Sequence, residues 1–231
     1  MSQLLKNIFL KFYELIKFRI YKNNLANCQI EYLGSDYGGW AFCPVNIDEN
    51  SIVYSFGIGE DISWDEALIK QKNVIVNGFD PTPRAIEFAK NKNIDKFVIH
   101  PKGIASSNGY MDFFPPKNPD HVSHSLVAKN NSSDEAIKVK VETIDTIMEE
   151  LGHKKIDILK MDIEGSEYEV IADMLNKRIY PEQLLIEFHH RFEPFTIDET
   201  IETINKLIEN SYKINYISKN NQDFSFIRKL D

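Results

Sequence analysis

Three carboxylates gather around one glycine, directly after a mostly apolar run of strand length. The run 156–161 is followed by Asp162, Glu164, Gly165 and Glu167. A run of this length that ends in turn residues and precedes a helical pattern is typical of a buried strand in a parallel sheet. Ligands of such sheets bind beyond the carboxyl ends of the strands, so Asp162 and Glu164 lie where chemistry is expected. The plainer alternative is that Asp162 caps the next helix while Glu164 is solvated.

A second strand-like run, 183–188, brings further ionisable groups to the same predicted edge. Glu187 and His189 share a face if this strand stays extended, and His189 then approaches Asp162 and Glu164. A histidine titrates near neutral pH and can accept a proton from a hydroxyl group. We therefore expect His189 to act as a base, Asp162 to orient an acceptor and Glu164 to support either. The alternative is a divalent cation held by Asp162, Glu187 and His189, since hard metals prefer carboxylate oxygens.

A glycine-containing loop, 57–61, follows the first predicted strand, 52–56. Gly57 and Gly59 permit a tight turn and the close approach of a ligand to the backbone. Ser63 and Glu66 predict a capping box at the start of the next helix. The acids at this helix start are Glu60, Asp61, Asp65 and Glu66. They would repel a dinucleotide pyrophosphate and favour the positive sulfonium of S-adenosylmethionine, unless they are simply solvated first-turn residues.

Asp80 ends the second predicted strand, about 20 residues beyond the glycines, which is the spacing at which a carboxylate holds ribose hydroxyls. We therefore expect Asp80 to bind the ribose of a cofactor, although it could merely begin a turn at Pro81. The loop 101–106 after the third strand, with Ile104 and Ala105, is then expected near the adenine.

Two segments lie outside this alternating pattern. Residues 4–21 form an apolar helical pattern with scattered lysines, which predicts packing on the domain or in a homodimer, or peripheral contact with an anionic membrane. Residues 29–33 and 39–45 predict a hairpin that walls a substrate cleft. The polar stretch 118–134 has the length of a recognition loop, and its candidate substrate contacts are His121, Ser123, His124 and Ser125.

The composition bounds the class of protein. The chain has 231 residues and a formal charge of -8, so we expect one main domain, 51–231, with an extension, 1–50, and no nucleic-acid partner. Cys28 and Cys43 have no metal-ligand companions, and we expect them to be thiols in a cytoplasmic protein, although they could face each other across the hairpin. Charged residues interrupt every apolar run near the start, which argues against a secretory signal or a spanning helix.

The order of these motifs resembles the FkbM family of S-adenosylmethionine-dependent methyltransferases. The resemblance rests on 56–59, 79–83, 103–105 and 141–145, and above all on 159–167 with 186–189. It implies a Rossmann-like α/β class I methyltransferase fold, with a mostly parallel seven-stranded sheet, a C-terminal antiparallel hairpin and helices on both faces. It also implies that Gly57, Gly59 and Asp80 contact the cofactor, while Asp162 and Glu164 line the reaction centre.

Two features depart from the pattern of class I methyltransferases. Ser55 and Phe56 stand where an acid usually ends the first strand, and the third glycine of the usual loop is absent. Glu60 or Asp61 is the candidate replacement for the acid. The predicted cofactor site therefore comprises Gly57, Gly59, Glu60, Asp80, Ile104, Ala105 and Asp162.

We expect an O-methyltransferase that acts on a hydroxyl of a sugar, surface glycan or related small metabolite. The abundance of Lys, Asn and Ile is typical of low-GC bacteria, in which such enzymes often modify surface polysaccharides. Two alternatives remain at this level. One is a catalytically silent methyltransferase-like binding partner, and the other is an NAD-dependent oxidoreductase.

Overall fold

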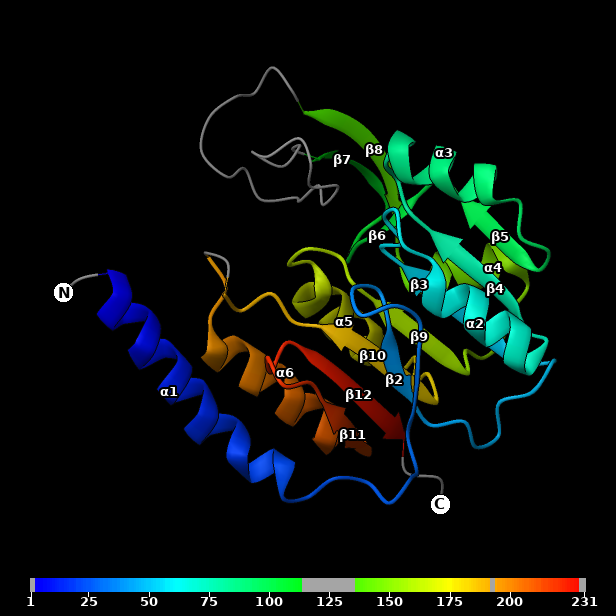
Figure 1. Cartoon of the computed structure of the whole chain (residues 1–231). Coiled ribbons are helices and arrows are strands. Elements are labelled where there is room, and N and C mark those ends of the chain that lie inside the picture. Colours follow the sequence, from blue (N-terminus) through cyan, green and yellow to red (C-terminus); the bar gives the residue numbers. More distant parts are fainter. Residues whose placement is uncertain (1–2, 114–135, 192–193, 229–231) are drawn as a thin grey trace.

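A seven-stranded sheet forms the centre of the molecule (Figure 1). The computed structural model describes residues 3–113, 136–191 and 194–228, with side chains from residue 13 onward. The strand order is β11-β12-β10-β9-β3-β4-β5. The parallel strands are β3 (Ile52–Phe56), β4 (Ile75–Phe79), β5 (Phe97–His100), β9 (Ile158–Met161) and β10 (Gln183–Glu187). The C-terminal hairpin of β11 (Tyr212–Ile217) and β12 (Asp223–Arg228) completes the sheet and confirms the predicted architecture.

Helices cover both faces of this sheet because its central strands are apolar on both sides. Leu159 packs in one cluster with α4 (Ile144–Leu151), α5 (Glu167–Asn176) and α6 (Ile197–Glu209). Its neighbour Ile158 packs in a second cluster with α2 (Ser63–Lys72), and α3 (Pro83–Lys92) contacts β5. Consecutive residues of a strand point to opposite faces, so β9 serves both clusters.

The predicted hairpin forms and is tied to the sheet beneath it. It consists of β1 (Glu31–Leu33) and β2 (Trp40–Phe42), and Trp40 and Phe42 are buried with Trp64 of α2. The side chain of Gln183 accepts from Cys43 N at 2.9 Å and donates to Cys43 O at 2.7 Å. The predicted boundary near residue 50 stays a prediction, but this part of the extension shares its core with the main sheet.

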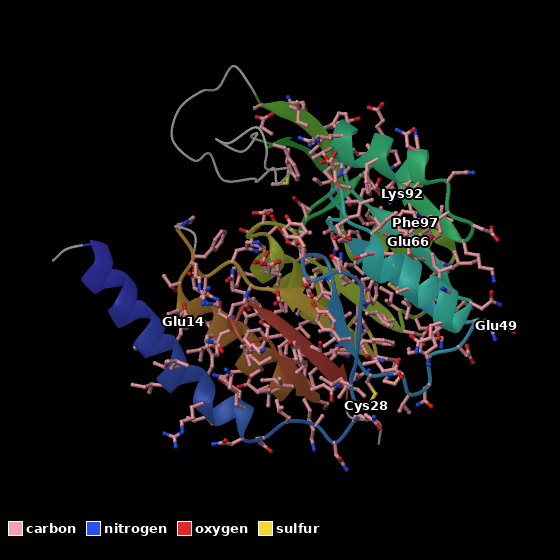
Figure 2. The ribbon with its side chains drawn as sticks, viewed as in Figure 1. Glu14, Cys28, Glu49, Glu66, Lys92 and Phe97 are labelled. Carbon is pink, nitrogen blue, oxygen red and sulfur yellow. A yellow bond between two sulfur atoms is a disulfide. The ribbon has the colours of Figure 1, made fainter. Side chains whose placement is uncertain are left out.

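Cys28 and Cys43 form a disulfide across the base of this hairpin, with their Cα atoms 6.0 Å apart (Figure 2). The expectation of two thiols was therefore wrong. The pairing arises because the hairpin brings both cysteines to the same end, which the sequence separation of 15 residues does not reveal.

The helix α2 begins where the sequence predicts, but without a capping box. The side-chain oxygen of Asp61 accepts a hydrogen bond from Ser63 N at 2.8 Å, which is the capping function predicted for Ser63. The Ser63 hydroxyl instead accepts from Ser35 N at 2.8 Å and so holds the hairpin loop. The helix α3 begins at Pro83, with Thr82 at the N-cap position.

A small second sheet was not predicted. Its order is β6-β8-β7, formed by β6 (Gly103–Ile104), β8 (Ile137–Glu142) and β7 (Gly109–Phe113). The segment 101–106, expected to be a loop, thus contains a two-residue strand that pairs with a segment more than thirty residues later. Such a short strand has no local signal. The candidate contacts His121, Ser123, His124 and Ser125 lie outside the described residues.

The helix α1 (Gln3–Lys22) lies along the outside of α6 (Figure 1). Phe18 is fully buried against Phe224, and Glu14 forms a two-pronged ion pair with Arg191 at 2.7 and 3.0 Å. One of the two predicted packing modes, packing on the domain, is therefore confirmed. Within the described chain, no helix is long and apolar enough to span a bilayer.

Candidate functional site

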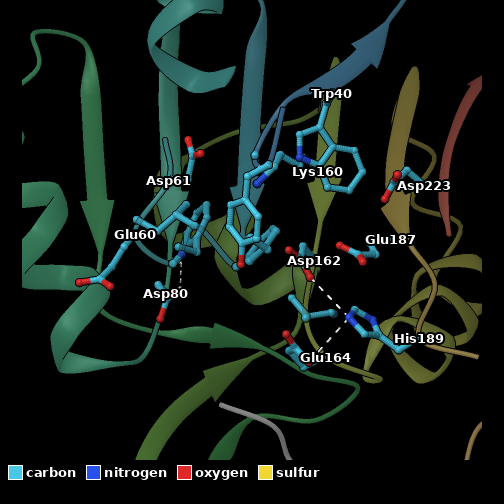
Figure 3. A pocket seen from close by; sticks show the side chains of 18 of the residues that line it. Trp40, Glu60, Asp61, Asp80, Lys160, Asp162, Glu164, Glu187, His189 and Asp223 are labelled. Atoms are coloured by element: carbon cyan, nitrogen blue, oxygen red, sulfur yellow. Dashed lines mark hydrogen bonds and ion pairs between the residues drawn. The ribbon is translucent and has the colours of Figure 1, made fainter. Parts of the chain in front are cut away.

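A cavity of about 530 Å³ opens at the carboxyl ends of β3, β4, β9 and β10 (Figure 3). This is the size of a pocket that holds a drug-sized ligand. Gly57, Gly59 and Asp80 line one side, and Asp162, Glu164, Glu187 and His189 line the other. The loop between β1 and β2 contributes Tyr37 and Gly38, as expected for a hairpin that walls a cleft.

Gly57 is required because β9 passes very close to it. Its φ is +72°, and a Cβ at this position would collide with the carbonyl oxygen of Asp162. Gly59 also has a left-handed φ, +51°, but a Cβ there would meet open space. Gly57 is therefore needed for the close contact between the end of β3 and the end of β9, whether or not a ligand is bound.

Asp80 joins the glycine loop to the start of α3. One carboxylate oxygen accepts from Gly59 N at 3.1 Å, and the other accepts from Thr82 N at 2.9 Å and the Thr82 hydroxyl at 2.6 Å. The two readings of Asp80 thus coexist, since it begins the turn and also lines the cavity. An ionised carboxylate has about four acceptor positions, so Asp80 keeps capacity for a ligand hydroxyl.

Of the other residues predicted to bind the cofactor, Glu60 and Ile104 line the cavity and Ala105 does not. Glu60 lines the cavity, but it is ion-paired with Arg84 at 2.7 Å, so it is not a free charge at the helix start. Ile104 lines the cavity as expected. Ala105 does not, because it faces the other way and packs with Val139 and Val141 of the second sheet. A contact between Ala105 and the cofactor stays a prediction that this packing does not support.

Asp162, Glu164 and His189 come together as the sequence predicts. The Nε2 atom of His189 lies 3.7 Å from Asp162 Oδ1 and 3.7 Å from Glu164 Oε2 (Figure 3). Neither acid serves α5 as a cap, because the residue at that position is Ser166. The plainer interpretation of a capping Asp162 and a solvated Glu164 does not fit this arrangement, since the Glu164 side chain is only 18% exposed.

Glu167 holds His189 in place. It is completely buried, and its Oε1 atom accepts from both the backbone N and the Nδ1 of His189 at 2.9 Å. Its other oxygen accepts from Gly165 N at 2.9 Å. With Nδ1 committed to Glu167, Nε2 faces the carboxylates of Asp162 and Glu164. No role for Glu167 was predicted, because its hydrogen-bond partner His189 lies 22 residues away in the sequence.

The charge state of His189 differs from the expectation. Burial alone would lower its pKa, but the hydrogen bond and charge of Glu167, with the charges of Asp162 and Glu164, raise the pKa to about 10. These neighbouring negative charges favour the protonated form of the imidazole. A protonated imidazole cannot accept a proton, so this environment favours a cationic His189 beside Asp162 and Glu164, and its role as a base stays a prediction.

Three carboxyl groups that line the cavity, those of Asp162, Glu187 and Asp223, are protonated more readily than usual. Burial, then the charge of Glu164, raises the pKa of Asp162 to about 6. Burial and the charge of Asp162 raise the pKa of Glu187 to about 8, and burial also raises the pKa of Asp223. Carboxyl groups with pKa values near the working pH are suited to general acid–base chemistry.

The same cluster offers ligand atoms for a cation. One atom each from Asp162, Glu164 and His189 lies within 4.8 Å of the others. This set differs from the predicted one, because it contains Glu164 in place of Glu187. Two carboxylates and an imidazole oriented by a buried carboxylate suit a divalent metal.

Lys160 is a lining residue that sequence reasoning missed. It is 3% exposed, its Nζ lies 3.3 Å from Ser55 Oγ, and it sits 5.4 Å from the ring centroid of Trp40. The available signal was a lysine in the middle of a strand otherwise expected to be buried on both faces.

A family model described as the methyltransferase FkbM domain matches residues 31–216, which is most of the chain. The chain belongs to the FkbM methyltransferase family. The match includes the β1–β2 hairpin, the glycine loop and the residues Asp162, Glu164, Glu187 and His189. The resemblance seen in the sequence motifs is thereby confirmed.

Curated relatives of this FkbM protein include the hexuronic acid methyltransferase AglP of Haloferax volcanii, 24% identical over 73% of this chain and 70% of that protein. The human probable methyltransferase-like protein 24 is also 24% identical, over 63% of this chain. The chain spans about a third of the length of that human relative.

Two solved structures show weaker similarity. An rRNA methylase from Streptococcus thermophilus has a TM-score of 0.45 at 14% identity, covering 80% of this chain and 90% of that one. Fibrillarin from Aeropyrum pernix, solved with bound S-adenosylmethionine, has a TM-score of 0.40 at 12% identity, covering 79% and 67%.

Proposed function

We propose that this protein is an S-adenosylmethionine-dependent O-methyltransferase that acts on a hydroxyl of a sugar, as part of a surface glycan or a related small metabolite. Membership of the FkbM family supports methyl transfer. The hexuronic acid methyltransferase among its relatives supports a sugar acceptor. The observation that carries the proposal is the single cavity shared by the glycine loop with Asp80 and the Asp162–Glu164–His189 cluster.

The first half of the cavity fits S-adenosylmethionine. Gly57 and Gly59 allow the cofactor to approach the backbone, and Asp80 retains acceptor capacity for ribose hydroxyls. Asp61 and Asp80 line the cavity near the start of α2, whose first turn carries no basic residue, and this favours a sulfonium over the pyrophosphate of NAD. The oxidoreductase alternative therefore has no support in this helix start.

Asp162 is the proposed base. Methyl transfer is an in-line displacement, in which the acceptor oxygen forms a bond to the methyl carbon as the carbon–sulfur bond breaks. The hydroxyl proton passes to a carboxylate of Asp162, whose raised pKa suits this task. Glu164 orients the acceptor, and the positive charge of His189 keeps the neighbouring Asp162 ionised while Nε2 donates a hydrogen bond to the acceptor oxygen.

A divalent cation is the second version of this mechanism. Asp162, Glu164 and neutral His189 would hold it, and it would lower the pKa of a bound hydroxyl. Calorimetric titration with Mn²⁺ distinguishes the versions, because a site in wild-type protein that Glu164→Gln loses supports the metal, and no binding leaves the metal-free version.

The decisive experiment measures binding and turnover separately. Calorimetry with S-adenosylmethionine, S-adenosylhomocysteine and NAD should give binding of the first two only. Asp162→Asn should abolish methylation of the sugar acceptors that wild-type protein accepts, with cofactor affinity within a few fold of wild type. Asp95→Asn, an exposed acid away from the cavity, is the control. Unchanged turnover in Asp162→Asn refutes the mechanism, and cofactor binding without any acceptor indicates the silent-partner alternative.

A further inference from the structure

In the described part of α1, residues 13–22, large apolar side chains remain exposed although other side chains already pack on the domain. Phe18 is buried, Glu14 is paired with Arg191, and Tyr21 donates to Asn205 of α6 at 2.7 Å. The side chains of Leu15, Ile16 and Ile20 nevertheless remain 58%, 54% and 75% exposed. Packing on the domain therefore leaves these three apolar side chains exposed to solvent.

Exposed apolar residues are concentrated in this part of the molecule. Of twelve large hydrophobic residues that the described chain exposes, five lie between residues 15 and 30, namely Leu15, Ile16, Ile20, Leu25 and Ile30. Leu25 and Ile30 also line a hollow of about 630 Å³ beside the end of α1, with Lys22 and Lys219 at its rim. Large apolar patches with a polar rim mark interaction surfaces.

The charge of α1 is opposite to that of the rest of the chain. The helix contains Lys6, Lys11, Lys17, Arg19 and Lys22 against Glu14 alone, which gives +4. The rest of the chain therefore carries -12, because the total is -8. Glu14 is buried in its pair with Arg191, while Arg19 and Lys22 are exposed beside the apolar residues.

We propose that α1 and the segment that follows it are a docking surface for an anionic lipid bilayer. Apolar side chains insert at the boundary between headgroups and acyl chains, and basic side chains beside them bind anionic headgroups. A second copy of the chain fits this surface less well. A twofold interface on this face would bury the exposed cations Arg19 and Lys22 of both copies in one contact area that the described residues give only basic charge, and like charges in an interface are unfavourable.

The docking surface is connected to the candidate active site. Arg191, which holds Glu14 of α1, also donates to Gln222 Oε1 at 3.0 Å and to the carbonyl oxygen of Asn220. Both residues line the cavity. A bilayer bound to α1 would therefore contact the helix whose Glu14 is linked through Arg191 to the cavity wall. If the proposed methyl transfer is correct, this arrangement suits an acceptor carried on a lipid.

Vesicle co-sedimentation of the full chain tests the proposal without reference to methylation. Wild-type protein should pellet with vesicles of phosphatidylcholine and phosphatidylglycerol, less with phosphatidylcholine alone, and less as salt rises. Ile16→Ser/Ile20→Ser should lower the partition coefficient about tenfold or more. Arg19→Gln/Lys22→Gln should lower it about fivefold for each charge removed.

Matched variants elsewhere on the surface serve as controls. Ile75→Ser/Ile208→Ser removes two exposed isoleucines, and Lys70→Gln/Lys90→Gln removes two exposed lysines, so both should leave binding unchanged. The proposal is overturned if wild-type protein stays in the supernatant, or if controls and test variants lose binding equally. Self-association by light scattering that Ile16→Ser/Ile20→Ser abolishes, without vesicle binding, would assign the face to a second copy.

Discussion

The pKa values of two adjacent histidines, His189 and His190, are shifted in opposite directions. The pKa of His189 is raised to about 10, whereas burial lowers the pKa of His190 to about 4. His189 donates to the buried carboxylate of Glu167, while the ring of His190 packs 5.7 Å from that of Phe18, centroid to centroid. The difference between cation and neutral ring thus comes from partners far away in the sequence.

Glu167→Gln tests the origin of the His189 charge. An amide cannot supply the negative charge of the carboxylate, so the pKa of His189 should fall toward its ordinary value, because burial then dominates. Titration of the imidazole signals by NMR measures this change. Glu169→Gln, an exposed acid on the same helix, should leave the pKa unaltered. If the pKa of His189 is unchanged in Glu167→Gln, the charges of Asp162 and Glu164 alone account for its raised value.

Glu187→Gln tests how much the ionisation of Glu187 destabilises the folded protein. The pKa of Glu187 is raised to about 8, above that of an unfolded glutamate, so its ionisation destabilises the folded state as pH rises from about 4.5 to about 8. The amide removes this penalty, so the melting temperature at pH about 9 should rise by about 2–4 °C. At pH about 4 the carboxyl is protonated in both states, and the two melting curves should coincide.

Among the structural elements, the glycine loop and β9 depend on each other. Gly57→Ala should destabilise the protein by about 2–4 kcal/mol, because the new methyl group meets the carbonyl of Asp162 at a left-handed φ. Gly59→Ala meets no atom and should cost only about 1 kcal/mol. Urea unfolding of both variants measures the difference, and equal losses would show that backbone conformation alone sets the requirement.

The sequence predicted the elements better than their long-range partners. Alternating apolar runs located the strands of the main sheet and the β1–β2 hairpin, since their signals are local. The two-residue strand β6, the disulfide and the Glu167–His189 hydrogen bond were not predicted. Each depends on a contact whose second member is set by tertiary packing. Asp162, Glu164 and His189 were found because parallel strands bring their ends to one edge.

At the scale of the whole molecule, the disulfide closes the hairpin that walls the cavity. Cys28→Ser/Cys43→Ser should lower the free energy of unfolding by about 3 kcal/mol, as expected for a bridge that closes a loop of about 15 residues. Urea unfolding measures the loss. Wild-type protein with reducing agent should match the variant, and identical midpoints with and without reductant would mean that the bridge is not formed in solution.

The strand order has a consequence for synthesis of the chain. β3 is made early and β4 pairs with one of its edges soon afterwards, but β9, the partner of its other edge, is made much later. Until then a nascent chain on the ribosome exposes the unpaired edge of Ile52–Phe56, a hydrophobic strand of the kind that promotes aggregation. The strand β9, which places Asp162 at the cavity, thus also covers the edge of β3 through which the newly synthesised chain could self-associate.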